Sequence, residues 1–249
     1  ANLGIVILLA LIFTFSFIGP FFLQDPLAQN LEKALQPPNQ EFLWGSDELG
    51  RDLLARVALG GQLSLLVGIV ATLVSLLIGV SYGVISGYFG NKVDLVMMRI
   101  VDVLYSLPYM FLVIILIAIL GKNIIALFIA LGAVQWLTTA RIVRGQVLSL
   151  KNSDFIKAAI LAGSSAPFIL IKHLIPNILP IVAVYATLTI PTVILQEAFL
   201  SFLGLNVSDC TWGLLASEGS SLLDVAWWMV LFPGLLLSIT LLCLSLIHI

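Results

Sequence analysis

The sequence is poor in charge. Only 10% of its 249 residues are Asp, Glu, Lys or Arg, whereas 61% are hydrophobic and the mean hydropathy is +1.16. A soluble domain carries about 25% charged residues. The composition therefore excludes an ordinary soluble globular protein and indicates a protein of the lipid membrane. The formal net charge of −2 and the lack of a basic stripe also argue against a nucleic-acid partner.

Residues that carry catalysis or bind metals are scarce as well. His173 and His248 have no Cys or carboxylate at metal-ligand spacing, and a disulfide between Cys210 and Cys243 is geometrically unfavourable. The sequence has no H-E-x-x-H pattern and no serine with a positioned base, which argues against an intramembrane hydrolase. It also lacks the G-x-x-x-x-G-K-[ST] phosphate loop. We therefore expect no catalytic residues, no metal and no directly bound cofactor.

Long hydrophobic runs are abundant. Crossing about 30 Å of hydrocarbon takes about 20 apolar residues in a helix. We predict an all-α, multi-pass membrane protein with one domain, residues 1–249, and six spans: 3–23, 63–86, 95–120, 124–143, 178–200 and 225–249. The first run lacks the positive start and the cleavage site of a signal peptide. Because the chain does not begin with Met, we expect its natural cytoplasmic amino terminus to be missing.

The distribution of Lys and Arg predicts the orientation, since cytoplasmic connections are enriched in positive residues. Placing residues 88–99 and 141–172 inside gives that side seven positive residues and the other side four. The inner seven are Lys92, Arg99, Arg141, Arg144, Lys151, Lys157 and Lys172, and the outer four are Lys33, Arg51, Arg56 and Lys122. Both termini are then expected to face the cytoplasm.

The segment 24–60 is the longest interruption of hydrophobicity and is expected to be an extracytoplasmic excursion. Asp47 precedes Arg51 by four residues, and Asp52 precedes Arg56 by four. Each such pair stabilises a helix by about 0.2–0.5 kcal/mol. We therefore predict an interfacial helix that leads into the second span, in preference to a ligand contact.

The second span contains a run of small residues at every fourth position. The run comprises Ala71, Ser75, Gly79, Gly83 and Gly87. Small residues at this spacing let the backbone of another membrane helix approach closely. We therefore predict a helix-packing face. In the third span, Pro108 is expected to bend or break the helix early.

Polar residues within the later spans are candidates for the transport path or its gate. Gln135, Trp136, Thr138 and Thr139 would be costly against lipid, so we expect them to face protein or water. Glu197 is an acidic residue near the outer end of the fifth span. A functional role and a structural hydrogen bond are both open for it.

The charged, glycine- and proline-punctuated segment 151–176 stands out in the middle of this hydrophobic chain. Asn152 and Ser153 suit a helix N-cap, and Asp154 suits the positive first turn of the helix that follows. Gly163 can end that helix in a left-handed conformation, and Pro167 can start a second one that runs to Pro176. A simple connection needs only a few residues. We therefore predict a cytoplasmic interaction segment.

This segment resembles the "EAA" loop of permease subunits in binding-protein-dependent ABC importers. That pattern is Glu-Ala-Ala, three residues, Gly, nine more residues and a hydrophobic stretch that ends in Pro. The matching positions are Lys157, Ala158, Ala159, Gly163, His173, Ile175 and Pro176. Lys157 replaces the usual Glu, which removes any ion pair that the Glu would make with an ATPase. The Ala/Gly shape is kept.

Further stretches resemble the second, C-type permease subunit of oligopeptide, dipeptide and nickel importers, from about residue 44 to residue 233. They are GSDELGRD, GYFGNKVD, MRIVDVLYSLP, ARIVRGQVLSLKNSDFIKAA, KHLIPNILP, EAFLSFLGL and TWGLL. The stretches VDVLYSLPYMFLVIIL and ARIVRGQVLSLKNSDF are most similar to the oligopeptide branch. The chain ends in CLSLIHI, where the family continues into a charged tail, so residues around His248 are given no functional weight.

The resemblance implies a type I ABC importer permease fold in the bacterial inner membrane. It implies a heterodimer with a second permease, two ATPase subunits that hold ATP and Mg²⁺, and an extracytoplasmic peptide-binding protein. The residues that would couple to the ATPase are Asp154, Phe155, Lys157, Ala158, Ala159, Gly163, His173 and Pro176.

The function expected from this resemblance is ATP-driven oligopeptide uptake, with dipeptide or nickel import as alternatives. A secondary transporter or channel is a further alternative, and Pro191 and Glu197 are its best support. It has few ionisable residues at mid-membrane, and it leaves the inner segment 151–176 unexplained.

Overall fold

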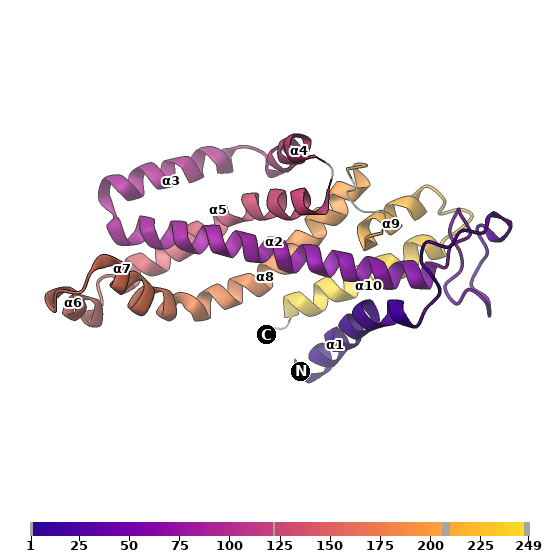
Figure 1. Ribbon diagram of the computed structural model, residues 1–249, viewed down its shortest axis with the longest axis horizontal. Coiled ribbons are helices and arrows are strands. Elements are labelled where there is room, and N and C mark those ends of the chain that lie inside the picture. The colour runs from indigo at the N-terminus through magenta and orange to yellow at the C-terminus, as the bar shows by residue number, and fades with distance from the viewer. Residues whose placement is uncertain (1, 122, 206–209, 247–249) are drawn as a thin grey trace. The chain divides into compact units, whose positions relative to one another are not determined.

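The computed structural model describes residues 2–121, 123–205 and 210–246, and these residues form helices, with a long connection over residues 19–52 between the first two (Figure 1). Lys122 and His248 lie outside the described residues. The described residues contain no β-strand, apart from an isolated bridge between Ser46 and Asp52. The helices are α1 (Asn2–Ile18), α2 (Leu53–Phe89), α3 (Asn91–Ser106), α4 (Tyr109–Leu120), α5 (Ile124–Leu150), α6 (Asp154–Leu161), α7 (Ala166–Ile169), α8 (Ile175–Phe202), α9 (Trp212–Ser220) and α10 (Trp228–Leu246).

The number of membrane spans agrees with the sequence prediction. Within the described residues, five helices are long and apolar enough to cross a membrane, and α3 with α4 makes a sixth if the bent pair counts as one span. The two helices meet at an angle of 92°. Pro108 lies at the break, as predicted, because a proline cannot donate the next hydrogen bond of the preceding helix.

The described contacts group into two compact units. The first unit comprises Ala1–Ile69, Lys122–Ile124 and Ile190–Ile249. The second comprises Val70–Gly121 and Ile125–Thr189. Each unit has its own buried apolar cluster and is considered separately below.

The core of the first unit surrounds Trp212, whose side chain is fully buried. The Trp212 indole N–H donates to the Val57 carbonyl at 2.8 Å, and its backbone N–H donates to Ser64 Oγ at 3.1 Å. Gly61 leaves the space for this ring, because a Cβ there would lie 2.5 Å from the indole. Helix α9 is thereby fixed against the start of α2.

The core of the second unit is the contact between α2 and α5. The predicted small residues of α2 lie along it: a Cβ on Gly79 would lie 2.5 Å from Thr139, and one on Gly83 would lie 2.6 Å from the Ala140 carbonyl. Gly87 approaches the Val147 side chain in the same way. Ser75 Oγ lies 3.2 Å from Thr139 Oγ1 within hydrogen-bond distance. The two backbones approach closely, as small residues in membrane helices allow.

Adding one methyl group to this contact should destabilise the protein. Gly83→Ala is expected to lower the free energy of unfolding by about 1–3 kcal/mol, since the new Cβ meets the backbone of α5 and one helix must shift. Thermal unfolding of the purified protein in detergent measures the change. Gly145→Ala on α5 is the matched control, because a Cβ there meets nothing within 4 Å. Equal melting temperatures for the two variants would contradict this account of the packing.

The predicted interfacial helix is wrong for residues 46–52, whereas the residues from Leu53 onward are helical and continue directly into the second span. Residues 46–52 form a tight loop, and the helix begins only at Leu53. The Asp47 carboxylate accepts hydrogen bonds from the backbone N–H groups of Leu49 and Arg51, both at 2.9 Å, and Gly50 adopts a φ of +69°. Such side-chain bonds to the backbone compete with helix formation.

The predicted pairing of Asp52 with Arg56 is also wrong. The Asp52 carboxylate instead accepts a hydrogen bond from the Leu54 N–H at 3.0 Å, at the beginning of α2, where an Asp can satisfy the unpaired N–H groups. Burial raises the pKa of Asp52.

The second predicted helix of the central segment does not stop at Pro176. Residues Ala166–Phe202 form one continuous helical stretch. A π-turn over Leu170–Leu174 precedes Pro176, and the Ile175 N–H donates to the Leu170 carbonyl. This wider turn changes the hydrogen-bond register just before the proline, so the helix continues without a break.

Candidate functional site

Helix α6 is bounded by the residues that the sequence indicated. Ser153 occupies the N-cap position, although its hydroxyl donates to the Leu150 carbonyl at 2.6 Å instead of capping α6. Gly163 follows the last turn with a φ of +82°, and the next N–H, of Ser164, donates to the Ala159 carbonyl at 3.0 Å. This is the left-handed helix ending that a glycine permits. The short helix therefore has a defined start and end.

A buried isoleucine holds α6 in place. Ile156 is fully buried and packs in a cluster with Val143 and Val147 of α5, Val84 of α2 and Leu174. It is the buried residue of α6. No local pattern predicts this anchor, because a lone Ile in an eight-residue helix gives no periodic signal.

The opposite side of α6 is exposed and mostly apolar. Phe155 is 42% exposed and Leu161 is 89% exposed. Ala158 is exposed and Ala159 is half-buried. Exposed apolar residues beside small ones form a shallow surface of the kind that contacts a partner. Gly163 has open space around it, so its conformation, not crowding, disfavours a larger residue there.

The remaining predicted coupling residues lie around this surface. Lys157 Nζ is 3.7 Å from the Asp154 carboxylate, and both side chains are exposed, so the ion pair contributes little to stability. The His173 ring lies 5.6 Å from the Phe168 ring and 6.4 Å from the Phe155 ring. Pro176 lies in the first turn of α8. The eight predicted residues thus fall on α6, on the turn at Gly163 and on the helical stretch that follows it.

The candidate path residues are spread over two helices. Gln135 and Thr138 lie on α5, where Gln135 is half-buried and Thr138 is exposed. Their neighbour Thr139 is buried and contacts Ser75 of α2. Trp136 packs edge-on against Tyr82, with ring centroids 4.7 Å apart.

Glu197 lies on α8 and is only 3% exposed. Its Oε1 accepts hydrogen bonds from Ser201 Oγ at 2.9 Å and from Thr211 Oγ1 at 2.8 Å. Its Oε2 has no hydrogen-bond partner within the part of the chain that the structure describes. The carboxylate therefore ties α8 to the start of α9. A role of Glu197 in the transport path stays a prediction.

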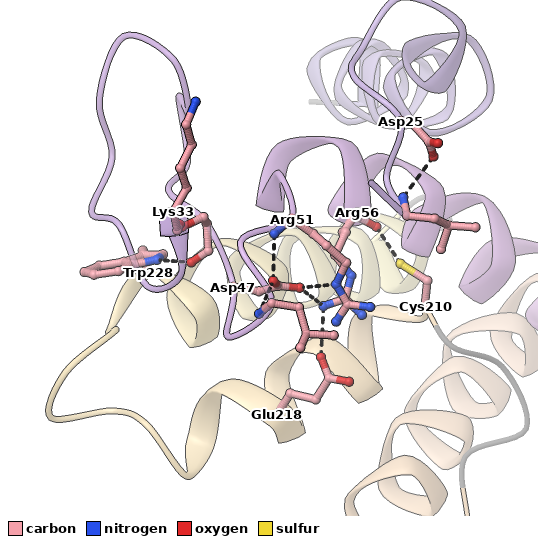
Figure 2. A network of polar contacts seen from close by, with 11 residues as sticks. Asp25, Lys33, Asp47, Arg51, Arg56, Cys210, Glu218 and Trp228 are labelled. Carbon is pink, nitrogen blue, oxygen red and sulfur yellow. Dashed lines mark hydrogen bonds and ion pairs between the residues drawn. The ribbon is translucent and has the colours of Figure 1, made fainter. Parts of the chain in front are cut away.

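A second polar cluster, the Asp47 network, lies in the first unit (Figure 2). The Asp47 carboxylate is fully buried and accepts from Arg51 Nε and from Arg56 Nη1, both at 2.6 Å. Arg56 is 1% exposed and also donates to Glu218 at 3.0 Å. The predicted pairing of Asp47 with Arg51 is confirmed. No local pattern predicts the contact with Glu218, which lies 162 residues from Arg56 in the sequence.

Neighbouring groups fasten the Asp47 network to the rest of the first unit. Cys210 Sγ donates to the Arg56 carbonyl at 3.0 Å, and burial raises the pKa of this thiol to about 11, so it keeps its proton at neutral pH. The Trp228 indole donates to the Ser46 carbonyl at 3.1 Å. Figure 2 shows the Cys210 contact beside Arg56 and the Trp228 contact beside Lys33. The described residues include no group of three or more His, Cys, Asp or Glu side chains that could hold a metal ion.

Comparison with known proteins identifies the family. Residues 79–248 match the family described as "Binding-protein-dependent transport system inner membrane component". The chain is 46% identical to the oligopeptide transport system permease protein OppC of Haemophilus influenzae, over 99% of this chain and 81% of the relative. It is 45% identical to OppC of Escherichia coli, over 99% of this chain and 83% of the relative.

A third relative is named for dipeptide transport instead of oligopeptide transport. The chain is 41% identical to the dipeptide transport system permease protein DppC of Bacillus subtilis, over 96% of this chain and 76% of the relative. The matched region includes α6 and most of the predicted spans. The helical membrane fold, the segment after α5 and these similarities all indicate the same family. The chain therefore belongs to the family of binding-protein-dependent transport system inner membrane components, as the sequence motifs predicted.

Proposed function

We propose that this chain is the C-type permease subunit of an ATP-driven oligopeptide importer and forms half of its translocation pathway. The two OppC relatives, at 45–46% identity over nearly the whole chain, support oligopeptide as the substrate class. The DppC relative keeps dipeptide transport as the alternative, and nickel import stays a more distant one. The chain itself is non-catalytic in this proposal.

The observation that carries the proposal is the construction of α6. One side of the helix is anchored through Ile156 in the core of the second unit, while Phe155, Ala158 and Leu161 are exposed. The sequence contains no phosphate loop of its own. An anchored helix with an exposed apolar surface fits a groove on a separate ATPase subunit. ATP and Mg²⁺ then bind to two such subunits below the membrane.

Movement enters the permease through this contact. When the ATPase subunits close on ATP, α6 is displaced, and its anchor passes the displacement to α2 and α5. The two helices move as a unit, because their backbones are in close contact at Gly79 and Gly83 and no free space remains between them there. The bundle thereby changes between inward-open and outward-open states, whose populations ATP shifts.

The outer surface of the permease receives the peptide. We propose that residues 24–60 and 201–224 face the outside and contact an extracytoplasmic binding protein. The buried Asp47 network keeps this surface in one conformation, because it links the loop before α2 to α9. A companion permease of similar fold completes the pathway as a heterodimer.

Cross-linking tests the contact with the ATPase. A cysteine at Ala158, which is exposed, is expected to cross-link to an ATPase subunit in native membranes. The natural cysteines give a low background, since Cys210 and Cys243 are only 3% and 6% exposed. A cysteine at Leu77 on α2, which is 74% exposed on a span, is the control and should give no such product. Labelling of Ala158→Cys only from outside the cell would overturn the topology.

The substrate is tested by purification of the whole assembly. We expect the tagged chain to co-purify with two ATPase subunits, a companion permease and a binding protein that retains oligopeptides. Retention of dipeptides or nickel would change the substrate class. Uptake by the purified chain in liposomes without any ATPase would support a secondary transporter instead.

A further inference from the structure

We propose that Arg144 is a positioning residue that makes α3 move together with α6 during transport. This inference rests on the proposed function, because it concerns how movement of α6 spreads through the second unit. It assigns a role to a charged cluster of α2, α3 and α5 that lies outside the ATPase-coupling segment.

The cluster is built around one carboxylate. Arg144 on α5 donates to both oxygens of Asp94 on α3, from Nε at 2.5 Å and from Nη2 at 2.6 Å. Ser86 Oγ on α2 donates to the same carboxylate at 2.5 Å. The Asp94 side chain is 16% exposed. A two-point contact between Arg and a carboxylate fixes direction as well as distance, so three helices are joined with a defined geometry.

A second contact closes the end of α2. Lys151 Nζ donates to the Tyr88 carbonyl at 2.5 Å, in the last turn of α2, where carbonyl groups lack partners within the helix. Gly87 lies against the Arg144 carbonyl and the Val147 side chain. The last turns of α2 and α5 are therefore held together beside Asp94.

The same turns of α5 also hold α6. Val143, just before Arg144, and Val147, three residues after it, pack in the cluster that buries Ile156. Helix α5 ends at Leu150, and α6 begins at Asp154. A displacement of α6 is therefore passed to α5 through apolar packing and from α5 to α3 through Arg144. Without Arg144, α3 keeps single hydrogen bonds to α2, from Ser86 to Asp94 and from the Tyr82 hydroxyl to the Met97 carbonyl, but loses the two-point contact with α5.

A neighbouring ion pair provides the matched control. Arg141 donates to Asp102 through one contact at 2.7 Å, between the same two helices. The side chains of Arg141 and Asp102 are 40% and 56% exposed, and the Arg141 guanidinium also lies over the Tyr105 ring. An exposed, single-contact pair contributes little. Removal of this pair changes the charge of the same surface without cutting the link at Asp94.

The first experiment measures coupling in the complete importer in liposomes. We expect Arg144→Gln to raise the ATP hydrolysed per peptide transported at least fivefold, with the ATPase still bound. Arg144→Lys should lie between wild type and Arg144→Gln, because an ammonium cannot make the two-point contact. The exchange Asp94→Arg with Arg144→Asp should recover part of the coupling, and Asp102→Asn should stay within twofold of wild type. An unchanged ratio for Arg144→Gln would overturn the proposal.

The second experiment measures the movement itself. Spin labels replace Val96 on α3 and Ile160 on α6, which are 57% and 49% exposed, in a complex with Cys210 and Cys243 changed to serine. We expect the same label distance with and without bound ATP in the otherwise wild-type complex, and two different distances in Arg144→Gln. Two distances in the presence of Arg144 would refute the inference but leave the proposed function intact. Failure of the ATPase to bind would refute the proposed function instead.

Discussion

Asp47→Ala is expected to destabilise the protein by about 3–5 kcal/mol, because it leaves the Arg56 guanidinium buried without its nearest carboxylate. Arg56 is 1% exposed, and Asp47 is fully buried at 2.6 Å from it. The Asp47 carboxylate also accepts backbone N–H groups that shape the loop before α2. Thermal unfolding in detergent and the yield of assembled complex measure the effect.

Two further variants separate the buried charge from other effects. Glu41→Ala removes the partner of Lys33 from an exposed pair in the same loop and should cost at most about 1 kcal/mol. Asp47→Ala combined with Arg56→Met should be more stable than Asp47→Ala alone, since the buried guanidinium that lost Asp47 is itself removed. A melting temperature for Asp47→Ala equal to that of Glu41→Ala would contradict the role given to the Asp47 network.

Ile156→Ala is expected to reduce peptide uptake at least tenfold. The truncation removes the buried anchor of α6 and costs about 2–5 kcal/mol at a helix of eight residues, so α6 detaches in a large fraction of molecules. Uptake, co-purification of the ATPase and amide hydrogen exchange over residues 154–161 report this. Ile156→Val removes one methylene group and should keep most of the uptake. Normal uptake by Ile156→Ala would show that the anchor is not needed for coupling.

The sequence predicted the features that depend on local patterns. Hydrophobic length gave the spans, the four-residue spacing from Ala71 to Gly87 gave the contact face of α2, and Gly163 marked the end of α6. Each of these follows from a residue type whose physical effect acts within a turn or two of the chain. The break at Pro108 belongs to the same class.

The features that the sequence missed depend on distant partners or on competition between local interactions. Arg56 selects Asp47 and Glu218 in place of Asp52, since the Asp52 carboxylate is used at the start of α2. The loop 46–52 replaced a predicted helix because the Asp47 side chain bonds the local backbone. The burial of Ile156 depends on residues of α2, α5 and α8, which come together only in the folded protein.

In the mechanism proposed above, the exposed surface of α6 receives the movement of a separate ATPase. The most direct measurement is ATP-driven uptake of a labelled oligopeptide by the complete complex in liposomes, comparing wild type with Ala158→Arg. Ala158 is exposed, so the substitution should leave the fold of the permease intact while it blocks docking of the ATPase. We expect uptake to fall at least tenfold while the melting temperature of the isolated chain is unchanged. Uptake at the wild-type rate, with the ATPase bound as before, would contradict this mechanism.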